Sequence, residues 1–494
     1  MRSAAICGFV LALGLGAFAG DGPVWLVVGR PGLVEAIGPL ADYRRAEGLE
    51  VVVSTDPVEQ AIAQAPRVPE FLLLVGDDES GKEAEPWYLP AKQVPFYRWN
   101  DKQPETFASD GAWGDLDGNG MPDIAVGRLP VRTPEEAAAM AAKILAYEQR
   151  PPCVDDLRLL AWAGAPGYGE MIDTLFSNML VNLLVKEAPA WMEYWLIASD
   201  RSHALCGWPP DQTARFAEQM RRGSLITVFM GHGSKGRLRS MMFNEKLVAF
   251  TEEDVKTYCG EGAPTAPIVL YTCGSGEFTI ADRCMAELFV LSPGGPVAAI
   301  GATTDSHPIP NHFSAVSLMD LLSGPEKRFG KLWLEAIRRA ETASDPLMDY
   351  FVSMAKRPEA KMDVARLKLD QRLMFNLLGD PAMAIKVPDQ VEVRVEKTAE
   401  GWHWSATKPA EGATLEVGRR ALVPLVKPVA GELDAEAANR AAEEADAAFT
   451  FKPVERATDA AWEGVETESV RLRWVTTGGG RIGVATQDLT PSAP

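Results

Sequence analysis

A cysteine and a histidine each follow a short apolar run and stand beside glycines. Cys273 follows Ile268 to Tyr271 in IVLYTCGSGEF, and His232 lies in MGHGS after another β-rich run. A nearby imidazole lowers the pKa of a thiol and can protonate a leaving amine. The adjacent glycines would let a substrate backbone approach and leave amide N–H groups free for an oxyanion. The pair indicates nucleophilic catalysis, with a buried structural cysteine and a turn histidine as the alternative.

Strands that end in glycine-rich loops would position these two residues. The chain from 232 to 273 has room for one crossover, which would make the preceding strands neighbours in a parallel sheet. Apolar segments alternate with amphipathic ones, and Thr133 and Pro134 mark a helix start at 133–149, so the sequence predicts an α/β fold. The expected strands are 24–29, 49–55, 70–79, 122–131, 157–166, 224–233, 266–276 and 295–303.

The 494 residues predict more than one domain. Residues 1–19 are typical of a signal peptide, because Arg2 precedes an apolar run from Ala4 to Leu15 and a small-x-small pattern ends at Ala19. That run is shorter than a membrane span needs, so we expect a secreted or periplasmic chain without a membrane span. The expected units are 20–152, an N-terminal α/β subdomain, 153–387, the catalytic subdomain, and 388–494, a β-rich tail with an acidic helical insertion at 431–449.

The net charge and the cysteine content limit the macromolecules and metals that the protein is expected to bind. The chain has 49 basic and 68 acidic side chains, a net charge of −19, which argues against nucleic acid or an anionic membrane as partner. Five cysteines follow the signal peptide, an odd number, and none forms a C-x-x-C pair, so a structural zinc site is not expected and disulfide partners cannot be deduced. They are Cys153, Cys206, Cys259, Cys273 and Cys284.

The segment DLDGNGMPD at 115–123 has the pattern of a calcium loop. Oxygen ligands recur at alternate positions and Gly120 occupies the sixth position, where the loop turns sharply. The twelfth residue is Val126, so the loop is not of the EF-hand type; an Asp/Gly-rich turn without metal is the alternative. The candidate ligands are Asp115, Asp117, Asn119, Met121 and Asp123, and Asp77, Asp78 and Glu79 after the preceding strand are candidates to share the ion.

Several segments, in order, carry a resemblance to a known family. They are FLLLVGDDE, DLDGNGMPDIAVGRLPVRTPEEAAAMAAKILAYE, GHGS, TCGSGEF, GPVAAIGATTDS and FNLLGDPAM. Over residues 22–387 the chain resembles the gingipain-type cysteine peptidases, peptidase family C25, which have a caspase-like fold. The resemblance implies an open, mostly parallel sheet flanked by helices in two subdomains. By its position, the β-rich tail is similar to the immunoglobulin-like β-sandwich that follows the gingipain catalytic domain.

The resemblance also implies roles for individual residues. Cys273 matches the nucleophile and His232 the general base and acid, with the amides of Gly233 and Cys273 as the oxyanion hole. Asp173 matches an S1-pocket carboxylate of arginine-specific members, which implies a basic P1 residue. The loop from Thr304 to His312 would line the same pocket, through Asp305, His307 and His312, but it lacks the aromatic residue expected there. The acid that orients the histidine in some members is replaced by AGAPG, with Glu170 nearest.

The predicted function is that of a secreted cysteine endopeptidase. It would hydrolyse polypeptide substrates by a Cys–His dyad, as a monomer with structural calcium and no organic cofactor. Two alternatives remain: a transpeptidase of the same fold, in which an amine resolves the acyl-enzyme, and a non-catalytic, calcium-stabilised surface binding module.

Overall fold

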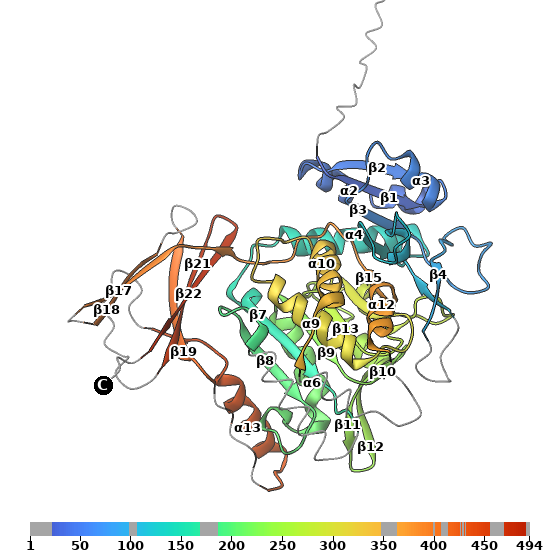
Figure 1. Ribbon diagram of the computed structural model, residues 1–494. Coiled ribbons are helices and arrows are strands. Elements are labelled where there is room, and N and C mark those ends of the chain that lie inside the picture. Colours follow the sequence, from blue (N-terminus) through green and yellow to red (C-terminus); the bar gives the residue numbers. More distant parts are fainter. Residues whose placement is uncertain are drawn as a thin grey trace, which may run out of the picture.

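The computed structural model describes residues 22–97, 106–167, 186–346, 363–398, 401–406, 413–424, 426, 429, 431–454 and 469–490. The predicted signal peptide, Glu170 and Asp173 lie outside these residues. At the centre is one ten-stranded sheet, flanked by helices (Figure 1).

Strand direction reverses once in this sheet. Every neighbouring pair is parallel except β14 and β15, which are antiparallel and join a five-stranded N-terminal half to a five-stranded C-terminal half. In spatial order the strands are β2 (Glu50–Ser54), β1 (Val24–Gly29), β3 (Phe71–Val75), β6 (Ala125–Leu129), β15 (Phe375–Leu378), β14 (Ala299–Ala302), β13 (Ile268–Tyr271), β9 (Ile226–Met230), β7 (Arg158–Ala163) and β8 (Glu193–Ala198).

The eight strands predicted in this region are confirmed, each within its expected segment. They are buried and rich in Val, Ile and Leu, as strands covered on both faces are. β8 and β15 were not predicted as strands. β15 comes late in the chain, yet it completes the N-terminal half through its pairing with β6 (Leu378 with Arg128). The two expected subdomains therefore share a single sheet.

The helices form two packed groups beside the sheet. In one, α4 contacts α8, α8 contacts α7, and α7 contacts α6; in the other, α9, α10 and α12 contact one another. Rings of Tyr271, Trp333 and Phe375 meet at 5.9–6.4 Å, so α10 packs over β13 and β15 (Figure 1). The helices are α1 (Pro31–Ala36), α2 (Gly38–Ala46), α3 (Val58–Gln64), α4 (Pro134–Gln149), α6 (Gln212–Arg222), α7 (Glu252–Cys259), α8 (Met285–Leu291), α9 (Pro308–Leu321), α10 (Phe329–Thr342) and α12 (Val364–Met374).

The C-terminal tail contains two β-sheets that share a core. Trp404 of the small sheet meets Trp474 of the large one at 5.9 Å, within a cluster that also buries Val417 and Leu472. The immunoglobulin-like assignment stays a prediction. The large sheet is β16 (Asp389–Gln390), β22 (Arg481–Leu489), β21 (Val470–Gly478), β19 (Thr414–Ala421) and β20 (Lys452–Pro453), and the small one is β17 (Val393–Thr398) with β18 (Gly401–Ala406).

The tail docks on the outer strand of the central sheet. Arg473 forms an ion pair with Glu193 of β8 at 2.7 Å, and Arg420 donates to the carbonyl of Met192 at 2.8 Å. Helix α13 (Ala435–Ala447), inside the predicted insertion, accepts a hydrogen bond from the Leu196 amide through Asp446. These contacts cover a sheet edge that would otherwise expose unpaired backbone groups. Among the described residues no helix combines the length and the apolar character needed to traverse a membrane.

Candidate active site

Cys273 and His232 lie at the same level on neighbouring strands. β13 and β9 are parallel, and their register pairs Tyr271 with Met230. Cys273 lies two residues after Tyr271, and His232 lies two residues after Met230. The crossover predicted from their spacing is therefore confirmed, and both residues follow the carboxyl ends of neighbouring parallel strands.

The glycines beside Cys273 and His232 pack closely against their surroundings, and their backbone amides differ in whether they already have a hydrogen-bond acceptor. The amide of Gly274 donates to the carbonyl of Thr304 at 3.0 Å and its φ is +60°, so this amide is engaged in the turn. The amide of Arg239 donates to the carbonyl of His232, so Gly233 occupies the next, non-hydrogen-bonded position of the ladder between β10 (Gly233–Ser234) and β11 (Arg237–Phe243). The Gly233 amide therefore points away from β11. A Cβ at Gly233 would overlap Oγ1 of Thr272.

The thiol of Cys273 is partly buried and protonated at rest. Its Sγ lies 3.6 Å from the carbonyl oxygen of Ser306 and donates to it. Burial raises the pKa of the Cys273 thiol to about 11, and the negative charge of Asp305 adds to the rise. A thiol in this environment needs a base to take its proton before it can attack.

The imidazole of His232 is held by a backbone carbonyl. Its Nε2 lies 2.8 Å from the carbonyl oxygen of Pro166, which follows β7. A carbonyl oxygen only accepts, so Nε2 carries the proton and Nδ1 is left as the acceptor. Pro166 belongs to AGAPG, the segment that stands where an orienting acid was sought. The sequence offered no signal for this partner, because every residue has a backbone carbonyl.

The loop after β14 places only some of the predicted pocket residues near the thiol. Asp305 acts on Cys273 through its charge. His307 caps α9, where its Nδ1 accepts from the Ile309 amide at 3.3 Å, and burial lowers its pKa to about 4. His312 is buried on α9 and faces Asp345 at 3.3 Å; burial lowers its pKa also. Both imidazoles are thus neutral near pH 7.

A cavity of about 510 Å³ opens beside His232, on the side of β7 and β8. Sequence reasoning missed it, because its walls come from five separate stretches of the chain. Its lining consists of Ala165, Pro166, Gly167, Ser199, Asp200, Arg201, Ser202, His232, Arg239, Ser240, Met241, Met242 and Leu247.

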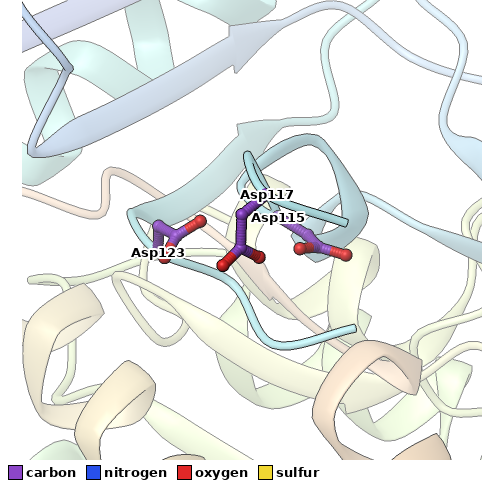
Figure 2. A group of neighbouring side chains, drawn as sticks. All are labelled: Asp115, Asp117 and Asp123. Carbon is purple, nitrogen blue, oxygen red and sulfur yellow. The ribbon is translucent and has the colours of Figure 1, made fainter. Parts of the chain in front are cut away.

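The predicted calcium loop brings three carboxylates together just before β6 (Figure 2). Asp115, Asp117 and Asp123 each offer an oxygen, and these oxygens lie within 4.8 Å of one another. Oδ1 of Asp115 is buried without a hydrogen-bond partner among the described residues, which fits a site built for a cation. Asn119 instead bonds the Asp117 carboxylate and the Met121 amide, and the side chain of Met121 packs on the core.

The expectation that Asp77, Asp78 and Glu79 share this ion is wrong. They follow the carboxyl end of β3, whereas the loop precedes the amino end of β6, its parallel neighbour. The two groups are separated by at least the strand length, roughly 16 Å for five residues. Asp77 pairs with Arg132 and Arg283, Glu79 pairs with Arg132, and Asp78 accepts from the Ala91 amide.

All five described cysteines are free thiols. Cys206, Cys259 and Cys284 are buried, and Cys153 is exposed. Burial raises the pKa of Cys206 to about 12 and that of Cys259 to about 11. Cys273, by contrast, follows a strand that is paired with the strand preceding His232.

An open sheet with one direction reversal and a cysteine and a histidine at the ends of adjacent parallel strands defines a caspase-like α/β fold. The chain belongs to peptidase family C25, whose family model matches residues 19–386. It is a cysteine peptidase, a hydrolase that acts on polypeptides. The sequence resemblance to gingipain-type peptidases is thereby confirmed.

Solved structures agree on the fold. The Arg-specific cysteine proteinase gingipain R (RgpB) is 17% identical with a TM-score of 0.54, over 96% of this chain and 98% of that one. The complex of Porphyromonas gingivalis RgpB pro- and mature domains is 15% identical with a TM-score of 0.53, over 95% and 100%. A structure described as a protease is 14% identical with a TM-score of 0.54, over 94% and 97%. No curated protein matches the sequence.

Proposed function

We propose that the protein is a secreted cysteine endopeptidase that cleaves peptide bonds with Cys273 and His232 as its dyad. One observation carries the proposal: the β9–β13 register sets both residues two positions beyond a paired Met230 and Tyr271. The hydrogen bond from His232 to Pro166 supports it, because it leaves Nδ1 as a base.

In the first step, Nδ1 of His232 takes the thiol proton as Sγ of Cys273 attacks the scissile carbonyl carbon. The carbonyl electron pair moves to oxygen, and the amides of Gly233 and Cys273 would donate to this oxyanion. The free direction of the Gly233 amide supports that assignment. The Gly274 amide takes no part, because Thr304 already accepts from it.

In the second step, the C–N bond breaks and the imidazolium gives its proton to the leaving amine. The acyl group stays on Sγ as a thioester. A water molecule then loses a proton to His232 and attacks the thioester carbonyl, which releases the carboxylic acid and restores the thiol. If an added amine replaces water at this stage, the product is a new amide, which separates transpeptidation from hydrolysis.

Calcium fits the loop at 115–123. Asp115, Asp117 and Asp123 would hold the ion. Met121 would offer its backbone carbonyl, whereas the Asn119 side chain would have to leave its present hydrogen bonds. Bound calcium would offset two of the three adjacent negative charges and cross-link the loop before β6. Its role is structural, and no step of the reaction depends on it.

The proposal also covers the P1 preference of the enzyme and the compartment in which it acts. Asp173 would accept a basic P1 side chain, and Asp305 lies beside the thiol as a second carboxylate of the pocket. The N-terminal signal pattern supports export to the periplasm or the medium, and the enzyme would act as a monomer. The net charge of −19 suits cationic substrates.

Labelling with iodoacetamide and with an arginyl chloromethylketone tests the dyad. Cys273→Ala should abolish peptide hydrolysis and labelling by the chloromethylketone. Cys153→Ala is the matched control, because Cys153 is the exposed cysteine outside the site, and it should leave hydrolysis unchanged. Hydrolysis that persists in purified Cys273→Ala protein would overturn the proposal. Peptides varied at P1 and compared between the wild type and Asp173→Asn test the basic preference.

A further inference from the structure

The cavity beside His232 lies on the far side of this residue from the nucleophile. The strand order is β13, β9, β7, β8, with Cys273 after β13 and His232 after β9. The cavity is enclosed by the loops after β7 and β8 and by the hairpin of β11 and β12 (Lys246–Thr251). A substrate bound to Cys273 therefore has to pass His232 to reach it.

Asp200 contributes a half-satisfied carboxylate to this cavity. The residue is 8% exposed. Its Oδ1 accepts from the amide and the hydroxyl of Ser202, at 3.0 and 2.9 Å. Its Oδ2 is buried with no hydrogen-bond partner, and no Lys, Arg or His nitrogen lies within 4.0 Å, among the residues that the structure describes. A buried carboxylate oxygen requires a donor, and the cavity is where one can enter.

The floor around Asp200 is rigid. Nε1 of Trp162 donates to Oγ of Ser199 at 3.0 Å, and the hydroxyls of Ser199 and Ser240 lie 2.6 Å apart. Ser240 in turn donates to Gln212 at 2.5 Å. This buried chain leaves neither serine hydroxyl free to swing to Asp200. The carboxylate is therefore held ready for an external donor.

The cavity walls suit a long side chain with a polar end. Apolar atoms come from Ala165, Pro166, Met241, Met242 and Leu247. A volume of about 510 Å³ accommodates one such side chain, whose methylene stem would contact these walls.

Two arginines also line the cavity. Arg201 forms an ion pair with Glu432 at 3.6 Å and lies over the ring of Phe243. Arg239 is exposed, whereas Asp200 is buried. The buried charged group of the cavity is therefore the unpaired carboxylate of Asp200, and electrostatic interactions are strongest at buried positions.

We infer that this cavity is a primed-side subsite, in which Asp200 binds a lysine or arginine side chain of the leaving part of the substrate. The inference rests on the proposed dyad: His232 protonates the leaving amine, so the chain segment that extends past His232 is the one released. Asp200 is a specificity-determining residue and takes no part in bond breakage.

Two types of substrate with the same unprimed sequence test whether the cavity lies on the primed side. Internally quenched peptides share one unprimed sequence and carry either lysine or norleucine at P1′, P2′ or P3′. A coumarin amide with the same unprimed sequence has no primed residue. In the wild type we expect kcat/KM to favour lysine over norleucine by about 10- to 100-fold at one primed position, the range for a hydrogen bond to a charged group.

Asp200→Asn should reduce that preference to about two- to threefold and leave kcat/KM for the coumarin amide unchanged. Arg239→Gln removes the exposed positive charge that lines the same cavity. This control variant should keep the preference for lysine over norleucine. Loss of coumarin-amide cleavage in Asp200→Asn would place the cavity on the unprimed side and overturn the inference. So would a preference for glutamate over norleucine that Arg239→Gln abolishes.

A binding measurement separates this inference from the proposed reaction. Calorimetry on the Cys273→Ala protein with the primed-side tripeptide carrying lysine should show binding that is at least about tenfold weaker for the norleucine analogue. Asp200→Asn in the same background should bind the two tripeptides equally. Equal binding before that substitution overturns the subsite, whereas failure of the dyad would leave this result unaffected. The unfolding midpoint of each variant shows that it is folded.

Discussion

The carbonyl oxygen of Pro166 lies 2.8 Å from Nε2 of His232 and sets the tautomer of the candidate catalytic base. A carboxylate in this position would carry a charge and would titrate. A backbone carbonyl does neither, so it orients the ring over the whole pH range without stabilising the imidazolium as strongly. The missing orienting acid therefore does not leave the histidine unrestrained.

The first prediction concerns this backbone contact. Pro166→Ala keeps the carbonyl, so kcat/KM should stay within about fivefold of the wild type. His232→Ala removes the base and should reduce kcat about 10²- to 10⁴-fold. Steady-state kinetics on one peptide measures both. Equal losses in the two variants would show that the proline ring, and not its carbonyl, is the important feature.

The second prediction concerns Gly233, which packs against Thr272. An added Cβ would overlap Oγ1 of Thr272 and lie 3.0 Å from the carbonyl oxygen of Arg237. Gly233→Ala should therefore lower stability by about 1–3 kcal/mol through overpacking and displace the amide proposed for the oxyanion. Gly236→Ala is the matched control, because a Cβ there meets no atom within 4 Å. Denaturant unfolding and kcat are the measurements; identical behaviour of the two variants would contradict the prediction.

The third prediction concerns the thiol. Asp305 raises the pKa of Cys273 because its negative charge disfavours the thiolate. Asp305→Asn should lower that pKa and raise the rate of iodoacetamide inactivation at pH 7.5, by roughly two- to fivefold, since one pKa unit changes the thiolate fraction about tenfold. Asp282→Asn, an exposed carboxylate in the segment after Cys273, should have no effect. A slower reaction in Asp305→Asn would show that this carboxylate positions the thiol instead.

The fourth prediction concerns calcium. With calcium at about 100 times its dissociation constant, the folded state gains about 2.7 kcal/mol, so EDTA should lower the unfolding midpoint of a chain of this length by about 3 °C. Asp115→Asn and Asp123→Asn should abolish this response. Glu59→Gln, at the start of α3, should retain it. A midpoint that EDTA leaves unchanged in the wild type would exclude a stabilising ion at this loop.

The fifth prediction concerns docking of the tail. Burial raises the pKa of Asp446 to about 7, although Arg215 lies 3.9 Å away and opposes the rise. The folded pKa lies above the unfolded one, so this group stabilises the fold most below pH 4. That contribution is lost as the pH rises through 7.

Asp446→Asn keeps the oxygen that accepts from the Leu196 amide but cannot ionise. The wild type should therefore lose several degrees of unfolding midpoint between pH 5 and pH 8, and the variant clearly less. Glu287→Gln is a useful comparison, because burial also raises the pKa of Glu287 to about 7, far from the tail. If Asp446→Asn and the wild type have parallel pH profiles, Asp446 is not the titrating group.

Much of the fold could be predicted because local patterns report burial. Continuous apolar runs bounded by glycine identified the strands before His232 and Cys273, and Thr133 with Pro134 identified the start of α4. β15 was missed, because four residues joined directly to α12 resemble the end of a helix. The grouping of three carboxylates in the loop at 115–123 was also predictable, because its members are close in sequence.

The amino-acid sequence was enough to predict the α/β class, the two candidate catalytic side chains and the family. These depend on residue type and spacing along the chain, which a single strand-to-loop segment carries. Three features became visible in the folded chain alone: Asp77 forms ion pairs with Arg132 and Arg283, the Pro166 carbonyl holds His232, and Asp200 lines a cavity beside His232. Each of those depends on strand order and direction, which pair residues distant in sequence, and no local pattern encodes such pairing.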